Sequence, residues 1–95
     1  LVTVDNIKQT VADYFRITVA DIDSKARPRN IAHPRMLAMV LARELTGQSY
    51  PSLGRQFGDR DHTTVINAKK KIQKLCEKDV QMKEAYENLK LQLVD

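Results

Sequence analysis

The sequence predicts a small all-α domain of about five or six helices that contains a helix-turn-helix. Apolar residues recur at intervals of three and four along almost the whole chain, and no segment alternates as a half-buried strand does. A tight Gly-containing turn separates a short helical segment from a longer, polar one, which is typical of a helix-turn-helix at approximately 49–76. The 95 residues suffice for one domain, 1–95, and the missing initial Met indicates a fragment of a larger protein.

The first helix is expected to begin after Thr3, a residue type that caps helix starts well. A short element follows in residues 17–23, with Val19 and Ile22 directed to the core. Residues 24–29 are basic and lack apolar periodicity, so they are predicted to form a loop. The apolar face of the first helix is Val4, Ile7, Val11, Tyr14 and Phe15.

A long helix is predicted to begin between Asn30 and Pro34 and to end at Gly47. Proline near the start and glycine just past the end of a helix are the usual arrangement. Its expected core face is Leu37, Val40, Leu41 and Leu45.

The helix-turn-helix follows from its capping residues. Ser49 is expected to cap a short helix with Pro51 in its first turn, where a missing N–H costs little. Residues 58–60 form the turn, and Asp61 caps the second helix. The second helix should bury Val65, Ala68, Ile72 and Leu75. A final helix starting near Asp79 should bury Met82, Tyr86, Leu89 and Leu93.

Charge is distributed unevenly along the chain. Residues 25–74 carry eleven Lys or Arg against three Asp or Glu, whereas the remaining residues carry five against nine. A basic middle between acidic ends indicates one face that meets a polyanion, and nucleic acid is the expected partner.

Several other classes of function are disfavoured. No segment approaches the roughly 20 apolar residues of a membrane span. The lone Cys76 fits a reducing, cytoplasmic compartment. His33, His62 and Cys76 lack zinc-site spacing, and no Ser or Cys nucleophile pairs with Asp61 and His62. We therefore expect no metal, no cofactor, no catalytic site and no membrane partner.

The start of the second helix of the motif carries residues suited to reading bases. Asp61 can accept from cytosine, while Thr63, Thr64 and the His62 ring can bond or pack against base edges. Farther along, Asn67 and Lys70, together with Lys71 and Lys74, can follow phosphates. Asp61 could instead be only an N-cap and the threonines ordinary first-turn residues, and both interpretations can hold together.

The basic loop is the second candidate element. Arg27 and Arg29 on an extended arm can reach a narrow, A·T-rich minor groove, and Arg35 could add a phosphate or groove contact. The helix start at 49–51 could bind a phosphate with its free N–H groups. Alternatively, the basic loop is only a solvated surface segment, and Ser49 serves only as a helix cap.

The segment Gly-Asp-Arg-Asp-His-Thr-Thr-Val at 58–65 resembles the signature of the C-terminal DNA-binding domain of the bacterial chromosomal replication initiator family, DnaA. The resemblance extends to residues 4–7, 24–25, 34–35, 42–46 and 71–72. It implies specific binding of double-stranded DNA at TTATCCACA-type boxes of a replication origin, in the bacterial cytoplasm and on the nucleoid. It also implies that the family's ATPase lies in a domain absent here, so that this chain is not an enzyme.

The resemblance assigns roles to particular residues. Arg27 matches the arginine that enters the minor groove, and residues 61–64 match the major-groove readers. Pro51 matches a residue near a thymine methyl, whereas Lys25, Arg35, Arg43, Tyr50 and Arg60 match positions at the DNA backbone. With the residues argued above, the predicted DNA-binding set is Lys25, Arg27, Arg29, Arg35, Arg43, Ser49, Tyr50, Pro51, Arg60, Asp61, His62, Thr63, Thr64, Asn67 and Lys70.

Three positions depart from the family pattern. Met36 stands where a polar residue often follows Pro-Arg, Asp59 replaces the second glycine of the turn, and Pro28 stiffens the arm. These departures bear on affinity and on fine sequence preference.

The domain is expected to be monomeric, and regulatory proteins could dock on the surface that DNA leaves free. The alternative functions are a non-specific nucleic-acid-binding helical module and a protein-interaction or membrane-surface module.

Overall fold

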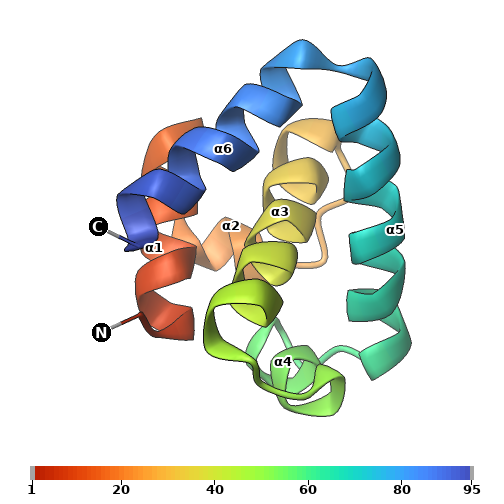
Figure 1. Cartoon of the computed structure of the whole chain (residues 1–95). Helices are drawn as coiled ribbons and strands as arrows, with labels where there is room; N and C mark the ends of the chain where they lie inside the picture. Colours follow the sequence, from red (N-terminus) through yellow and green to blue (C-terminus); the bar gives the residue numbers. More distant parts are fainter. Residues whose placement is uncertain (1, 95) are drawn as a thin grey trace.

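The computed structural model describes residues 2–94, and this part of the chain is entirely helical (Figure 1). The predicted all-α class with five or six helices is therefore confirmed. The helices that it contains are α1 (Val4–Phe15), α2 (Val19–Asp23), α3 (Arg29–Thr46), α4 (Tyr50–Gln56), α5 (His62–Lys78) and α6 (Val80–Val94). None of the helices within residues 2–94 is both long and apolar enough to cross a bilayer.

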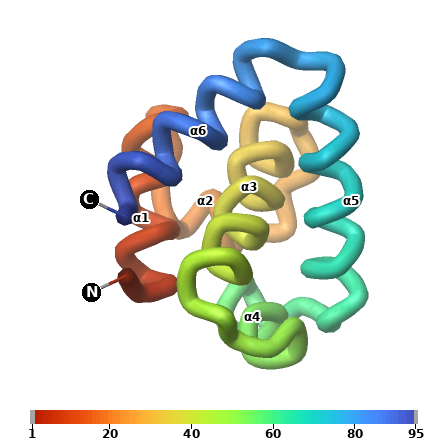
Figure 2. Tube along the Cα trace, in the orientation of Figure 1, coloured from red at the N-terminus to blue at the C-terminus, as the bar shows by residue number. Residues whose placement is uncertain are grey.

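Helix α3 is the centre of the fold and contacts every other helix. In Figure 1, α5 runs beside α3 on one side, and α1 and α6 lie on the other. Figure 2 shows that α6 returns over α1, so that the start of α1 and the end of α6 lie at the same side of the molecule. The core-facing residues of α3, Leu37, Ala38, Met39 and Leu41, are at most 1% exposed. Burial of this apolar face against all neighbours is the main stabilising term of the fold.

Local capping explains where the first two helices begin. The Thr3 hydroxyl accepts from the Asn6 N–H at 3.1 Å, which confirms the predicted cap of α1. Helix α2 has only five residues, and a capping box supports it. The Thr18 hydroxyl accepts from the Asp21 N–H, and the Asp21 carboxylate accepts from the Thr18 N–H, both at 3.0 Å.

Helix α3 begins at Arg29, so the predicted start between Asn30 and Pro34 was one residue late. The N–H groups of Ile31 and Ala32 donate to Pro28 O at 3.0 and 2.8 Å, which draws the preceding residues into the first turn. Arg29 is therefore helical and not part of the loop. Pro34 lies inside the helix and is buried, instead of marking its first turn.

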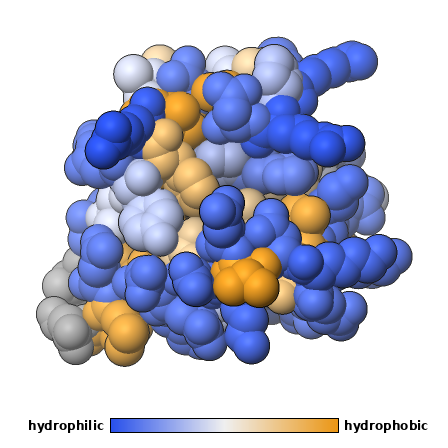
Figure 3. Space-filling model, turned by 90° about the horizontal axis from the view of Figure 1, so that it is seen from above, coloured by the Kyte–Doolittle hydropathy of each residue, from blue (hydrophilic) through white to orange (hydrophobic). Residues whose placement is uncertain are grey.

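The outer surface is mostly polar. Seen from above, apolar side chains form small separate groups among polar ones (Figure 3). Three of the large apolar side chains that are exposed, Val80, Leu91 and Val94, belong to α6. Leu45, Leu75 and Tyr86, which were predicted to be core residues, are only half-buried and pack against the core from its edge.

Candidate nucleic-acid interface

The close approach of α4 to the turn that follows it depends on Gly54. The Arg60 N–H donates to Gly54 O at 2.7 Å. A Cβ at position 54 would lie 2.3 Å from Arg60 O, so only glycine fits without a backbone shift. This contact sets the angle at which α5 leaves the turn, and with it the angle of the helix-turn-helix.

The turn itself places two consecutive residues in the left-handed region. Gly58 has φ 71° and Asp59 has φ 55°. A Cβ at Gly58 would lie 2.3 Å from Asp23 O, so the turn also packs against the end of α2. Asp59 is exposed and lies in a conformation that favours glycine.

We expect Asp59→Gly to raise the free energy of unfolding by about 0.5 kcal/mol. The left-handed conformation costs a non-glycine residue about 1–2 kcal/mol, which exceeds the roughly 0.4–1 kcal/mol lost by making the unfolded chain more flexible. Urea unfolding monitored by circular dichroism measures the change. Asp59→Ala is the matched control and should be less stable than the native protein. A stabilised Asp59→Ala would show that φ strain is not the cause.

The start of α5 presents four consecutive exposed residues, 61–64. Asp61 Oδ1 accepts from the Thr63 N–H at 2.8 Å, which confirms the predicted N-cap. This backbone bond, followed by a bond from the Thr63 hydroxyl, holds the pKa of Asp61 below its usual value. The His62 ring lies beside the carboxylate, with Nδ1 at 3.2 Å from Asp61 Oδ1. The side chains of Thr63 and Thr64 are exposed, and their contact with bases stays a prediction.

The basic loop lies next to the turn and to α5. Lys25 and Arg27 are exposed, and Lys25 Nζ donates to Gly58 O at 3.3 Å. Burial lowers the pKa of His33, and the charges of Lys71 and Arg29 lower it further. Arg29 at the start of α3 and Lys71 on α5 are therefore close enough to act on one side chain. The loop and α5 both carry exposed cations, among them Lys25, Arg27, Lys70 and Lys71.

The start of α4 is the remaining predicted element of the site. The Ser49 hydroxyl accepts from the Ser52 N–H at 3.2 Å, so the predicted cap is confirmed. Pro51 is exposed in the first turn. The Arg43 guanidinium stacks 4.5 Å from the centre of the Tyr50 ring and donates to Gln48 O at 2.6 Å. Both side chains are half-buried, and this packing holds them in place.

Two arginines of the predicted DNA-binding set are directed into the protein. Arg35 is only 7% exposed, and its guanidinium donates to Ile22 O at 2.8 Å. Arg60 is half-buried and donates to Phe57 O at 2.6 Å and to Ser24 O. Desolvation lowers the pKa of both guanidinium groups, and for Arg35 the charge of Arg60 lowers it further. The sequence predicted phosphate contacts for both, whereas their donors are directed to backbone carbonyls.

Sequence reasoning missed Lys8, which is 4% exposed. Its ammonium donates to Gln56 O, lies 4.8 Å from the centre of the Phe57 ring and lies 2.9 Å from Asp23 Oδ1. The contact with Asp23 is an ion pair without hydrogen-bond geometry. The signal was present in the sequence, because position 8 lies four residues after Val4 and three before Val11, on the buried face of α1.

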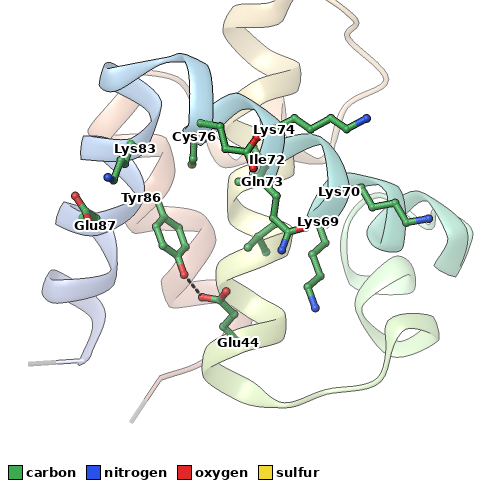
Figure 4. A pocket seen from close by; sticks show the side chains of 12 residues that line it. Glu44, Lys69, Lys70, Ile72, Gln73, Lys74, Cys76, Lys83, Tyr86 and Glu87 are labelled. Atoms are coloured by element: carbon green, nitrogen blue, oxygen red, sulfur yellow. Dashed lines mark hydrogen bonds between the residues drawn. The ribbon is translucent and has the colours of Figure 1, made fainter.

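A groove on the other side of α5 has a different character. It lies between α3, α5 and α6, and α5 contributes Lys69, Lys70 and Lys74 to its lining (Figure 4). Tyr86 closes part of it by donating its hydroxyl hydrogen to Glu44 Oε1 at 2.6 Å, and half-buried Cys76 also lines it. Among residues 2–94, no group of three or more His, Cys, Asp or Glu side chains is placed to hold a metal ion.

Comparison with known proteins agrees with this geometry. The family described as the bacterial dnaA protein helix-turn-helix matches residues 4–72. The chain belongs to this family. Helices α4 and α5, joined by the turn at 57–61, are thus the dnaA helix-turn-helix, a DNA-binding element of proteins that act in replication initiation. The expected family resemblance is confirmed.

A solved relative supports the same assignment over nearly the whole chain. The crystal structure of a DNA replication initiation factor is 30% identical and superimposes with a TM-score of 0.83. The match covers 95% of this chain and 27% of that protein. The dnaA helix-turn-helix domain described here therefore corresponds to about a quarter of that larger relative.

Proposed function

We propose that this domain reads TTATCCACA-type boxes in double-stranded DNA at a replication origin. Helix α5 would enter the major groove with residues 61–64, and the loop at 24–28 would place Arg27 in the adjacent minor groove. One observation carries the proposal: the start of α5 and the basic loop are both exposed, and Lys25 of the loop donates to Gly58 O in the turn that leads into α5. An α-helix fits the major groove, and an extended basic arm fits the minor groove.

The remaining contacts in this proposal are to the DNA backbone. Cations and N–H groups at helix starts, on either side of α5, would bind phosphates. Such contacts position the protein on the duplex without reading its sequence. Pro51, exposed at the start of α4, would pack near a thymine methyl group. The proposed backbone contacts are Lys25, Arg29, Arg43, Ser49, Tyr50, Asn67 and Lys70.

The proposal extends to how the domain is used. Because the chain corresponds to 27% of the solved relative, we propose that it supplies the DNA reading of a larger bacterial protein. It would act as a monomer on each box, in the cytoplasm and on the nucleoid. ATP hydrolysis would belong to another domain of that protein, and regulatory proteins would bind the surface away from DNA.

Fluorescence anisotropy with a labelled TTATCCACA duplex, against a scrambled duplex at the same near-physiological salt, tests this function. A specific reader should prefer the box by about a thousandfold or more. Equal and steeply salt-dependent binding to both duplexes would instead identify a non-specific nucleic-acid-binding module.

Lys70→Ala should weaken binding to the box and to the scrambled duplex by the same factor. Lys70 is exposed on α5 beyond the base-reading residues, so we assign it to phosphate only. The slope of log affinity against log salt should become shallower by about 1. Lys83→Ala on α6 is the matched charge control and should leave both affinities unchanged. A loss confined to the box would make Lys70 a base reader.

A further inference from the structure

We propose that Arg35 and Arg60 are positioning residues that hold the basic loop in register with α5. The proposal rests on the proposed function, because the elements held in register are its two readers. Both guanidinium groups converge on the carboxyl end of α2, residues 21–24, from which the loop departs. We call this arrangement the α2 clasp.

Arg35 holds the α2 end from the side of α3. Its Nε donates to Ile22 O at 2.8 Å, and its Nη2 donates to Asp21 O at 3.3 Å and to the Ser24 hydroxyl at 3.5 Å. The last carbonyls of a helix lack partners within it and carry partial negative charge. A buried cation at this end therefore satisfies Ile22 O and adds a donor to Asp21 O, which also accepts from the N–H and the hydroxyl of Ser24.

Arg60 holds the same end from the side of the helix-turn-helix. Its Nη1 donates to Phe57 O at 2.6 Å, and its Nη2 donates to Ser24 O. One planar guanidinium thus joins the last residue before the turn to the first residue of the loop. Such a two-pronged contact requires the fork of arginine, which lysine lacks.

The clasp brings three cations to one carboxylate, that of Asp23. Asp23 attracts both guanidinium groups and opposes the desolvation that lowers their pKa values. Lys8 from α1 completes the arrangement, with its ammonium 2.9 Å from Asp23 Oδ1. Half-buried cations this close to one another persist only where acceptors compensate them. Turning either arginine toward DNA would leave backbone carbonyls unpaired.

The clasp acts directly on the two readers. The Ser24 carbonyl accepts from the Arg60 guanidinium, and the Ser24 hydroxyl accepts from the Ala26 N–H at 3.2 Å. These two bonds fix the path of the loop just before Arg27. Arg60 is the residue immediately before Asp61, the cap of α5. A single side chain therefore links the minor-groove arm to the start of the major-groove helix.

A double-mutant cycle between Arg60→Lys and Arg27→Ala tests this inference, with anisotropy on the TTATCCACA duplex. Arg60→Lys keeps the charge but cannot bridge both carbonyls, so affinity should fall about tenfold. In the Arg27→Ala background the same change should cost less than about threefold, because the reader that the clasp positions is already absent. Near-native affinity of Arg60→Lys, or equal losses in both backgrounds, would overturn the proposal.

Amide hydrogen exchange without DNA separates the clasp from the proposed function. Exchange at Ala26 should become faster in Arg60→Lys, while exchange in the core of α3 stays at the native rate. Ser24→Ala removes the acceptor of the Ala26 N–H directly and gives the exchange rate expected when that bond is lost. Unchanged exchange at Ala26 in Arg60→Lys would refute the clasp. If the native domain shows no preference for the box, the function fails, and the exchange result still decides whether the clasp exists.

Discussion

Gly54→Ala should lower the free energy of unfolding by about 3 kcal/mol, the largest effect of any substitution considered for this domain. The added Cβ would meet Arg60 O at 2.3 Å, and the contact is with backbone, which cannot rotate away. Forcing a methyl group into a packed site typically costs about 1–3 kcal/mol and occasionally more. Alanine favours a helix by about 1 kcal/mol over glycine, and this offsets only part of the cost.

Urea unfolding followed by far-UV circular dichroism measures the effect. Gly47→Ala is the matched control, because nothing lies within 4 Å of its added Cβ and only its φ of +66° opposes the change. That control should lose about 1 kcal/mol. If Gly54→Ala lowered the free energy of unfolding no more than Gly47→Ala, the inferred close contact between α4 and the turn would be wrong. A folded Gly54→Ala variant should also bind the TTATCCACA box less tightly, because α5 would leave the turn at a different angle.

Thr63→Ala should cost about 1–3 kcal/mol of binding free energy on the TTATCCACA duplex, with little change on a scrambled one. The Thr63 side chain is exposed in the first turn of α5, and its backbone N–H, which the substitution retains, makes the cap to Asp61. The helix should therefore stay intact while a base contact is lost. Anisotropy on both duplexes measures the ratio of affinities directly.

Thr10→Ala is the matched control for this prediction. It removes the same atoms from α1, where the hydroxyl donates to Asn6 O at 2.8 Å and lies on a helix that does not pack against α5. Its affinity for both duplexes should equal that of the native domain. Equal losses on the two duplexes for Thr63→Ala would remove this residue from base reading and leave it a first-turn residue only.

Features that depend on neighbouring residues were the most predictable. The caps at Thr3, Ser49 and Asp61 were expected, and each forms a bond to an N–H two or three residues away. Helical periodicity likewise identified most of the core, but it missed Met39 and the buried alanines at 12, 38, 42 and 85. The start of α3 was less predictable. Pro28, the residue before the helix, makes no side-chain capping hydrogen bond, and the residue types between it and Pro34 do not mark a helix start.

The candidate site was only partly predictable, for a related reason. Exposure of Arg27, His62 and Thr63 follows from their place in a loop or on the polar face of a helix. The inward orientation of Arg35 and Arg60 could not be foreseen. Their acceptors lie 13 and 36 residues away, on elements whose packing the chain order does not reveal.

The sequence by itself determined the helical class, the helix-turn-helix with its family, and the basic character of the middle of the chain. These depend on periodicity, capping residues and composition, which act over a few residues. Only the tertiary structure decided which cations are directed into the protein. Lys8, Arg35 and Arg60 are directed inward because the packing of α2 against α1, α3 and the turn leaves carbonyls and one carboxylate that cations must satisfy.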